Sequence, residues 1–438
     1  MPSWGRQLGS MPDMKGPIAR GTIRTTVVLG LRLLVQAGTL LLIARLLGPD
    51  QFGAFAGVAA LAVMLGTLAT FGTHLVLLGE VSKDPNRRAQ VLHYAVPSTL
   101  ICGGLLLAIY MAISLLALRE ASVPIAVLIA IGVTETVLQP LFTLPAMEFL
   151  ALGQIARSQL LQTLPMVLRL AAAATVFLLH PIDPLAAYGY GYLAASVIAL
   201  GVATLTMPAS WPGPRDWHAP SKAQLHEAVG YAVLNITATT PAELDKMLAI
   251  KLLPLPAAGL YAAGARVIGA ATLPVIAMML SALPRLFREG QDQPRRTARL
   301  INWIFAATLA YSVALALVLW LIVPIFVWIF GAKYQGIQQM IHWLCLVVPG
   351  MALRVSVGSI LMALGRPWMR VGFEVVGLMV LIFAAVALTA HFGAIGMPLA
   401  LACSEWAMAL IGIGYIAVVR IVGGPLQPAA GLGNPDGN

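Results

Sequence analysis

Ten ionisable side chains lie inside long apolar stretches of the sequence, and they are the residues best placed to do chemistry. The basic ones are Arg32, Arg169, Lys246, Arg266 and Arg354, and the acidic ones are Glu135, Glu243, Asp245, Glu374 and Glu405. A charge in the middle of a lipid bilayer costs roughly 2.5–3.5 kcal/mol even on a lenient insertion scale, so such a residue normally faces a cavity or a charged partner. A purely structural membrane scaffold would not need ten of them.

Helical spacing indicates where some of these groups point. Two polar stripes each follow one face of an apolar helix: Thr25, Arg32, Gln36 and Thr39 in the first, and Asn235, Thr239, Glu243 and Lys246 in the second. The stripes suggest that the two helices face each other across a central space. The alternative is that the polar groups hydrogen-bond neighbouring helices and bind no ligand. We favour that alternative for a single Thr or Asn, and a cavity for Arg32, Arg169 and Arg354.

The partners of the other charges are less clear from spacing. Adjacent residues project about 100° apart on a helix, so Asp245 and Lys246 do not simply neutralise each other. The sequence leaves open whether Asp245 forms an ion pair with Arg266 in the next span instead. Glu374 follows Arg370 by four residues, a spacing that favours an ion pair between them. Two acidic groups that lie deeper in their apolar stretches are candidate proton or cation sites: Glu135 and Glu405.

Composition places these charges in a membrane protein. Apolar residues make up 59% of the 438 residues, charged residues make up 10%, and the mean hydropathy is +0.88. A soluble domain carries roughly 45–50% and about 25%, and could not hide so much apolar surface. The three cysteines, Cys102, Cys345 and Cys403, lie in apolar runs and show neither a disulfide framework nor a metal-binding spacing. We therefore expect an all-α integral membrane protein.

A helix needs about 20 apolar residues to cross the hydrocarbon layer. Twelve candidate spans follow one another at 23–47, 52–78, 93–117, 123–145, 159–180, 186–207, 229–252, 259–283, 299–322, 337–363, 369–391 and 394–420. The loops on one side carry eighteen Lys and Arg residues, and those on the other carry four, namely Arg45, Arg119, Lys251 and Lys333. Basic loops stay in the cytoplasm, so we expect both termini to be cytoplasmic.

This loop asymmetry accounts for most of the net charge of +10, so no nucleic-acid partner is expected. The first apolar stretch is too long for a cleavable secretion signal, contains Arg32 and Gln36, and lacks a small-residue cleavage site. It is expected to remain as the first span.

A Pro-rich segment divides the spans into two sets of six, and an internal repeat supports this division. Arg45-Leu46-Leu47, Gly53 and Phe55 recur 206 residues later as Lys251-Leu252-Leu253, Gly259 and Tyr261, and Ala151-Leu152-Gly153 recurs as Ala363-Leu364-Gly365. Repeats of six spans share one orientation, which implies a pseudo-two-fold axis along the membrane normal and a substrate site between the halves. We expect a cytoplasmic tail over 1–22, six-helix lobes over 23–207 and 229–420, a cytoplasmic linker over 208–228, and a disordered cytoplasmic tail over 421–438.

Several chemistries are absent from the sequence. No G-x-x-x-x-G-K-[ST] loop occurs, so the chain carries no ATPase of its own. No H-E-x-x-H or paired Cys/His spacing marks a metal site, and no cofactor is expected. No extracytoplasmic loop exceeds about fifteen residues, which leaves no domain to hold the acceptor of a membrane glycosyltransferase or ligase. We therefore expect a transporter and not an enzyme.

Two motifs resemble those of a known family. Residues 44–53, Ala-Arg-Leu-Leu-Gly-Pro-Asp-Gln-Phe-Gly, are similar to the R-L-L-G-P-x-x-F/Y-G signature of bacterial polysaccharide exporters. The second comprises residues 244–248, Leu-Asp-Lys-Met-Leu, followed by residues 259–266, Gly-Leu-Tyr-Ala-Ala-Gly-Ala-Arg. Over essentially its whole length the chain resembles the Wzx-type O-antigen flippases of the multidrug/oligosaccharidyl-lipid/polysaccharide (MOP) exporter superfamily. It departs from them in its short length and lean loops.

The resemblance implies a substrate, an undecaprenyl-diphosphate-linked oligosaccharide, flipped by alternating access from the cytoplasmic to the periplasmic leaflet of the bacterial inner membrane. An Arg-lined cavity suits a sugar-diphosphate headgroup. The residues expected to contact substrate are Arg32, Gln36, Arg169 and Arg354, with Lys246 and Arg266 nearer the exit. The ion-coupling or ion-pair candidates are Glu135, Asp245, Glu374 and Glu405. The implied partners are membrane lipids, a coupling proton or sodium ion, a polysaccharide polymerase and a chain-length regulator.

Other functions remain as alternatives. A cation-coupled multidrug antiporter of the same superfamily would share the fold, but its cavity should be acidic, whereas five basic and five acidic groups are expected inside this one. A lipid-linked peptidoglycan-precursor flippase usually has fourteen spans. A membrane glycosyltransferase or ligase would need the exposed loop and the acidic catalytic pair that this sequence lacks.

Overall fold

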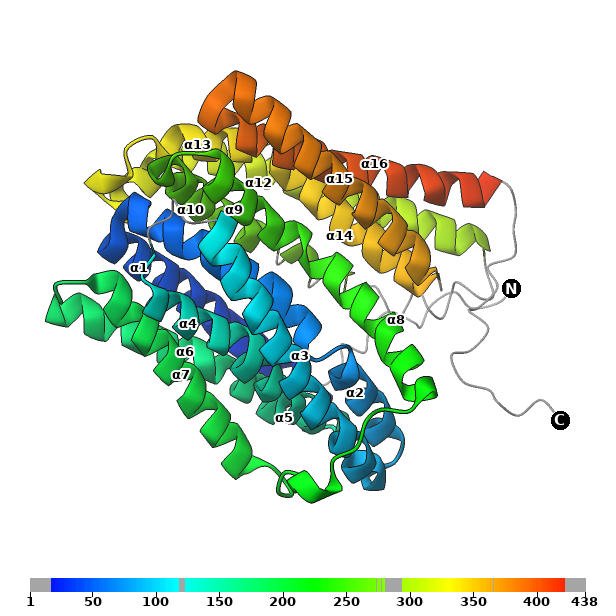
Figure 1. The fold of residues 1–438 in the computed structure, drawn as a ribbon. Helices are drawn as coiled ribbons and strands as arrows, with labels where there is room; N and C mark the ends of the chain where they lie inside the picture. Colours follow the sequence, from blue (N-terminus) through cyan, green and yellow to red (C-terminus); the bar gives the residue numbers. More distant parts are fainter. Residues whose placement is uncertain are drawn as a thin grey trace, which may run out of the picture.

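The computed structural model describes residues 17–117, 123–272, 274–276, 278–279, 294–364 and 366–421 (Figure 1). Every regular element in these ranges is a helix. The first half, here called the N-lobe, comprises α1 (Pro17–Ala69), α2 (Thr73–Lys83), α3 (Arg88–Ala117), α4 (Ile125–Val133), α5 (Gln139–Ala151), α6 (Ile155–Leu179) and α7 (Pro184–Thr206). The second half, the C-lobe, comprises α8 (Lys222–Thr239), α9 (Pro241–Leu252), α10 (Leu255–Ala271), α12 (Pro294–Phe330), α13 (Ile337–Leu344), α14 (Val347–Ala363), α15 (Pro367–Phe392) and α16 (Gly396–Ile421).

Each of the twelve predicted spans corresponds to helical structure over its described residues; the end of the eighth, from 280 to 283, lies outside them. Judged by length and apolarity alone, eight helices of the described part can cross a membrane, or nine when the bent pair α13 and α14 counts as one span. Two of the eight, Leu34–Ala69 and Trp368–Val418, each run through two consecutive predicted spans. The seventh predicted span, formed by α8 and α9, is not among them; its α9 half has only 12 residues and carries Glu243, Asp245 and Lys246.

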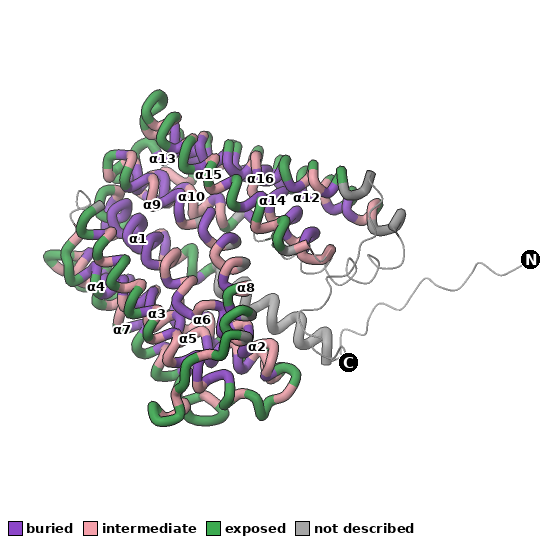
Figure 2. The backbone as a smooth tube through the Cα atoms, turned by 45° about the vertical axis from the view of Figure 1, so that its right-hand side comes forward, coloured by how far each residue is buried: buried purple, intermediate pink, exposed green. Residues whose placement is uncertain are grey.

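The helices present apolar side chains outwards, as a lipid-facing surface requires. The buried residues lie on the inner faces of the helices, and exposed residues follow their outer faces (Figure 2). Among the exposed side chains are Leu116 on α3, Leu205 on α7 and Trp328 on α12, which are 79–86% exposed. In a water-soluble protein such contiguous apolar surface would drive aggregation. The composition-based expectation of an all-α membrane protein is thus confirmed.

The turn after the first span depends on a glycine. Gly48 has φ of +70°, a conformation that costs little only for glycine, and it is followed by Pro49 within the continuous run assigned as α1. This break turns α1 into the two segments that the sequence predicts as separate spans. We call the end of the molecule that holds Gly48, the α9–α10 turn and Gly331 the opposite end. The end that holds the loop between α2 and α3, with Arg87 and Arg88, is the basic end.

The two lobes end equivalent helices in the same way. The repeated Ala-Leu-Gly segments fall where α5 ends at Ala151 and α14 ends at Ala363. The residue after each end, Leu152 or Leu364, has nearly the same backbone conformation, with φ of −77° and −81° and ψ of 7° and 5°. The repeat found in the sequence therefore reflects a structural repeat. Gly365 itself lies outside the described residues.

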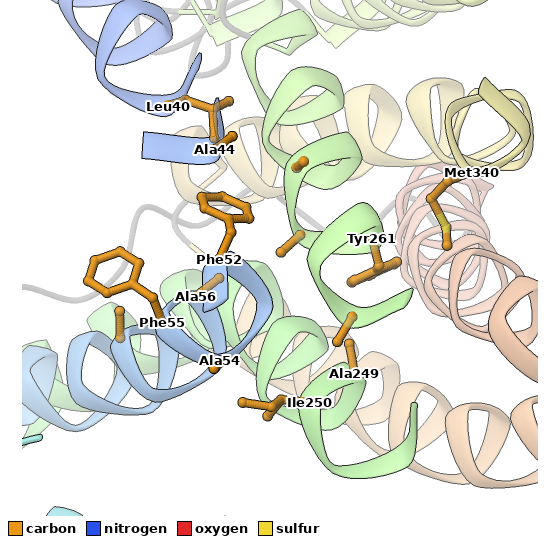
Figure 3. Packing of buried hydrophobic residues seen from close by; sticks show 14 of the residues in the cluster. Leu40, Ala44, Phe52, Ala54, Phe55, Ala56, Ala249, Ile250, Tyr261 and Met340 are labelled. Carbon is orange, nitrogen blue, oxygen red and sulfur yellow. The ribbon is translucent and has the colours of Figure 1, made fainter. Parts of the chain in front are cut away.

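The lobes meet at the opposite end through glycines from this repeat. A methyl group on Gly259 of α10 would lie 1.9 Å from the carbonyl oxygen of Pro49, and one on Gly53 of α1 would lie 2.6 Å from that of Leu255. The two glycines, 206 residues apart, are thus in backbone contact with each other's segments. Figure 3 shows α1 and the α9–α10 region packed together here, with Phe52 and Ile250 among the buried side chains.

Hydrogen bonds add to this contact. Arg45 donates from Nε to the Ile329 carbonyl at 2.6 Å, and Tyr334 donates its hydroxyl to the Ala44 carbonyl at 3.0 Å. Both cross from the N-lobe to the C-lobe. Towards the basic end the lobes are joined differently, because α8 runs between them and packs on α1, α2 and α15 (Figure 1).

The connection between the lobes packs on the N-lobe. Arg88 donates to the carbonyls of Ala209 and Ser210 at 2.7 and 3.3 Å and to the buried Glu148 carboxylate at 2.5 Å. The following helix starts earlier than the linker predicted over 208–228 would allow. Ser221 caps α8 by accepting from the Gln224 backbone, and the Gln224 side chain accepts from the Ser221 N–H.

Candidate functional site

The fourth span of each lobe is interrupted midway. In the N-lobe the break is a π-helical turn, η3 (Thr134–Leu138), between α4 and α5. In the C-lobe α13 and α14 meet at an angle of 42°. Departures from a regular α-helix at corresponding places in two repeats point to a transporter's binding site. Both breaks lie beside buried ion pairs.

The N-lobe break is enclosed by glycines. A methyl group on Gly66 of α1 would lie 2.2 Å from the Glu135 carbonyl oxygen, and one on Gly103 of α3 would lie 2.4 Å from that of Thr136. The absence of side chains at these positions lets α1 and α3 approach the wider π turn. π turns of this kind are frequent at functional sites, and this one carries Glu135.

Glu135 is the centre of a hydrogen-bonded group inside the N-lobe. Its Oε1 atom accepts from Arg169 Nη2 of α6 at 3.0 Å and from the Tyr192 hydroxyl of α7. The guanidinium lies over the Tyr192 ring, 3.8 Å from its centre, and also donates to Ser196 Oγ at 3.3 Å. Two of the predicted site residues, Glu135 and Arg169, are therefore partners.

A matching pair lies inside the C-lobe. Arg354 of α14 donates from Nε to Glu405 Oε2 of α16 at 2.6 Å, and both side chains are buried. Trp406, next to Glu405, donates from Nε1 to the Leu346 carbonyl at 3.0 Å, which satisfies an oxygen at the bend between α13 and α14. The predicted residues Arg354 and Glu405 thus also form a pair, and it lies in the other lobe.

The charges of α9 form a third group. Tyr261 of α10 donates its hydroxyl to Asp245 Oδ2 at 2.8 Å. Lys246 Nζ lies 3.4 Å from Asp245 Oδ1 and 3.5 Å from Glu243 Oε2. This differs from the expectation that Asp245 and Lys246 would point apart: the carboxylate folds back and also accepts from the Lys246 backbone N–H at 2.7 Å.

Arg266 stands apart from these pairs. No carboxylate within the described ranges lies within ion-pairing distance of it, so the open alternative of pairing with Asp245 is not what the structure shows. Its guanidinium instead lies 5.9 Å from the centre of the Phe52 ring, across the lobe contact. Gln36 is exposed on α1. The Arg32 side chain lies outside the described residues, as does that of Thr25.

The remaining expectations have simple outcomes. Arg370 pairs with Glu374 at 2.9 Å, which confirms the expectation from their spacing. Thr39 and Thr239 each donate to the carbonyl four residues earlier on their own helix, so among the described residues their hydroxyls bond only within that helix. No group of three or more metal-binding side chains occurs in the described part of the chain.

Sequence reasoning missed the tyrosines of the site. Tyr192 and Tyr261 donate to Glu135 and Asp245, and both are buried. A signal was present for Tyr261, because it is the repeat equivalent of Phe55 and replaces an apolar ring with a hydrogen-bond donor. Tyr192 has no such marker in an apolar stretch.

Outside the membrane-spanning segments, Glu80 forms a charged cluster at the basic end. It lies beyond the predicted span 52–78 and pairs with Lys83 at 2.8 Å and with Arg87. Hydrogen bonds from these two basic side chains lower the pKa of Glu80 from its ordinary value of 4.5. Its carboxylate therefore stays ionised at any physiological pH.

A family comparison relates the chain to known proteins. A family described as "Polysaccharide biosynthesis protein" matches residues 18–289, more than half of the chain. No curated protein sequence matches significantly.

Solved structures with a similar fold are transporters. An inward-facing multidrug resistance MATE family transporter of the MOP superfamily has a TM-score of 0.73 and 13% identity, over 92% of this chain and 98% of that one. A MOP superfamily transporter from Pyrococcus furiosus has a TM-score of 0.64 and 14% identity, over 92% and 95%. An outward-facing MATE transporter has a TM-score of 0.63 and 12% identity, over 93% and 97%. At such low identity these likenesses establish the two-lobed MOP fold alone.

Proposed function

Because the chain belongs to the polysaccharide biosynthesis protein family, we propose that it moves a lipid-diphosphate-linked oligosaccharide, carried on undecaprenol, from the cytoplasmic to the periplasmic leaflet. Family membership is the observation that carries this proposal, and the transporter fold supports it. Movement occurs by alternating access, with one lobe rocking against the other. The product serves surface polysaccharide synthesis, as O-antigen, capsule or exopolysaccharide.

The distribution of charge supports a phosphate-bearing headgroup. Arg169 and Arg354 are each neutralised by a carboxylate within their own lobe. Arg266 lies at the contact between the lobes without a carboxylate in the described part of the chain, so its positive charge is available to an anionic ligand. An Arg guanidinium binds phosphate oxygens with two parallel hydrogen bonds. We assign the diphosphate to Arg266, together with Arg32 on the predicted polar stripe of the first span.

The topology follows from the loop charges. We place the basic end in the cytoplasm and the opposite end in the periplasm, with both termini cytoplasmic and the protein in the bacterial inner membrane. The contact between Gly53 and Gly259 then closes the periplasmic side. Glu135, Asp245, Glu374 and Glu405 are the residues available for coupling to a proton or sodium gradient.

The test compares a deletion strain with strains in which the gene is restored. Lipid-linked oligosaccharide is extracted and measured on each face of the inner membrane. We expect accumulation on the cytoplasmic face, relieved by the wild type but not by Arg32→Ala or Arg266→Ala. The matched control is Arg157→Ala, since Arg157 is exposed at the start of α6 and bonds only the nearby Gln154 among described residues.

Two outcomes would overturn the proposal. One is a normal distribution of the lipid in the deletion strain with intact surface polysaccharide. The other is full activity of both Arg variants at normal membrane levels, which would remove the assigned headgroup contacts. Sensitivity of the deletion strain to cationic drugs, with unchanged lipid distribution, would instead indicate a multidrug antiporter.

A further inference from the structure

A small cavity lies between α5 and α6 of the N-lobe. Its volume is about 100 Å³. It is lined from α5 by Gln139, Phe142, Thr143, Ala146 and Met147, and from α6 by Gln162 and Met166. None of these residues is among the charged groups of the site, and the sequence patterns did not single them out.

The polar groups of this cavity are uncharged and partly unused. Gln162 is held by a hydrogen bond from its Nε2 to Ser158 Oγ at 3.2 Å, and Ser158 donates to the Ala146 carbonyl at 2.7 Å. The side-chain oxygen of Gln162 and the whole amide of Gln139 make no hydrogen bond to any described residue. Gln139 offers two N–H donors and an acceptor oxygen, and Gln162 offers its remaining N–H and its oxygen, so together they can bind hydroxyl groups.

The rest of the lining is apolar. Phe142, Met147 and Met166 supply an aromatic ring and two thioether chains, which adapt to irregular shapes. A sugar ring has this same division, with hydroxyl groups on its rim and C–H bonds on its faces. The absence of any basic side chain among the lining residues disfavours a phosphate at this position.

The cavity continues the helix faces that carry the N-lobe ion pair. Gln139 follows Glu135 by four residues, and Gln162, Met166 and Arg169 follow one another at i, i+4 and i+7. On α6 these spacings place side chains on one face of the helix, whereas the π turn between Glu135 and Gln139 shifts the helix face by one residue. The face of α6 that lines the cavity therefore also carries Arg169, the partner of Glu135.

We propose that this cavity binds one sugar ring of the oligosaccharide headgroup, an inference that rests on the proposed function. The volume is smaller than the about 150 Å³ of an apolar cavity that holds one benzene molecule, so only one side of a single ring enters and the rest stays outside the cavity. Gln139 and Gln162 bind the hydroxyl groups, and Phe142 and Met166 contact the C–H face. The sugar thus binds in the N-lobe cavity, while the diphosphate binds at the contact between the lobes.

The test measures how much the sugar adds to binding. Purified full-length protein is titrated with lipid-linked oligosaccharide extracted from the deletion strain, and separately with undecaprenyl diphosphate that carries no sugar. We expect the wild type to bind the glycosylated lipid more tightly. Gln139→Met and Gln162→Met, which keep side-chain length and helix propensity, should each reduce that preference about two- to tenfold, the effect of one lost hydrogen bond, without changing binding of the bare lipid.

The control variant is Gln159→Met, because Gln159 lies on α6 but does not line the cavity. It should keep the full preference. A wild type that binds both lipids equally, or cavity variants that keep the preference, would overturn the sugar site while leaving the proposed function standing. A wild type that binds neither lipid would overturn the proposed function itself.

Discussion

Gly259→Ala tests the contact that closes the opposite end. The new methyl group would lie 1.9 Å from the Pro49 carbonyl oxygen, whereas ordinary contacts of a Cβ atom begin near 3.4 Å. The obstacle is backbone, which cannot rotate away as a flexible side chain can. The segments carrying Pro49 and Gly259 must therefore separate by about 1.5 Å, the difference between these two distances.

The size of the effect follows from the cost of overpacking. Inserting a methyl group into a well-packed contact typically costs about 1–3 kcal/mol. The cost applies only while the lobes touch at this end, so the substitution shifts the population towards arrangements in which they are apart. Since about 1.4 kcal/mol is tenfold in an equilibrium constant, the expected shift is roughly 5- to 150-fold.

Thiol labelling measures this shift. The reporter is Ile250→Cys, because Ile250 is 7% exposed and packs against Gly57 in the same contact. The three native cysteines are replaced by Ala, and a membrane-impermeant maleimide is added to the side that bears the opposite end. Labelling should be slow with Gly259 intact and at least about fivefold faster with Gly259→Ala.

The control is Gly201→Ala, because a methyl group at Gly201 of α7 would meet nothing within 4 Å. It should leave the labelling rate unchanged and slightly favour the helix. Equal labelling rates with Gly259 and with Gly259→Ala, in correctly folded protein, would refute the inference that this glycine contact closes the opposite end.

Three further predictions concern charges. Glu135→Gln leaves Arg169, whose side chain is 18% exposed, without its carboxylate. The free energy of unfolding should fall by up to about 3–5 kcal/mol, measured by thermal unfolding in detergent. Failure of the added Arg169→Met change to restore stability would contradict this. Arg88→Ala removes the hydrogen bonds that hold the connection between the lobes and leaves Glu148 unpaired. Limited proteolysis within 208–221 should therefore be faster. An unchanged rate would contradict the inference that Arg88 holds this connection on the N-lobe. Because the pKa of Glu80 is lowered, its ion pairs stabilise the basic end fully above pH 4.5, and this stabilisation is lost as the pH falls through the lowered pKa. Amide exchange near residue 80 should therefore become faster over that pH range. In Glu80→Gln this pH dependence should be absent.

Periodicity and hydropathy were sufficient for the helical architecture. The twelve spans follow from apolar length, and the Arg370–Glu374 pair follows from a spacing within one helix. The repeat of Gly53 at Gly259 indicated two equivalent lobes. It did not indicate that the two glycines meet, because equivalence fixes a position in each lobe and not its distance from the symmetry axis.

The long-range pairs could not be predicted in this way. Glu135 and Arg169 lie on different helices, and hydropathy specifies neither the rotation of a helix about its axis nor its neighbours. The same limit applies to Arg354 and Glu405. The prediction of an Arg-lined cavity therefore did not include the two carboxylates that pair with Arg169 and Arg354. The π turn at Glu135 leaves no periodic signal, since it shifts the helix face by a single residue.

The pairing of charges within each lobe also determines how the protein responds to the membrane potential. Glu135 with Arg169, and Arg354 with Glu405, each combine one positive and one negative charge. Carrying one net charge across the membrane changes the free energy by about 2.3 kcal/mol per 100 mV, but a lobe that moves with a paired charge carries almost no net charge. The voltage then acts mainly on the charges outside these two pairs, among them Arg266 and the α9 group of Glu243, Asp245 and Lys246, and on the anionic substrate that we propose. The lobes can thus hold ionised side chains in the bilayer while the electric field has little influence on which way they face.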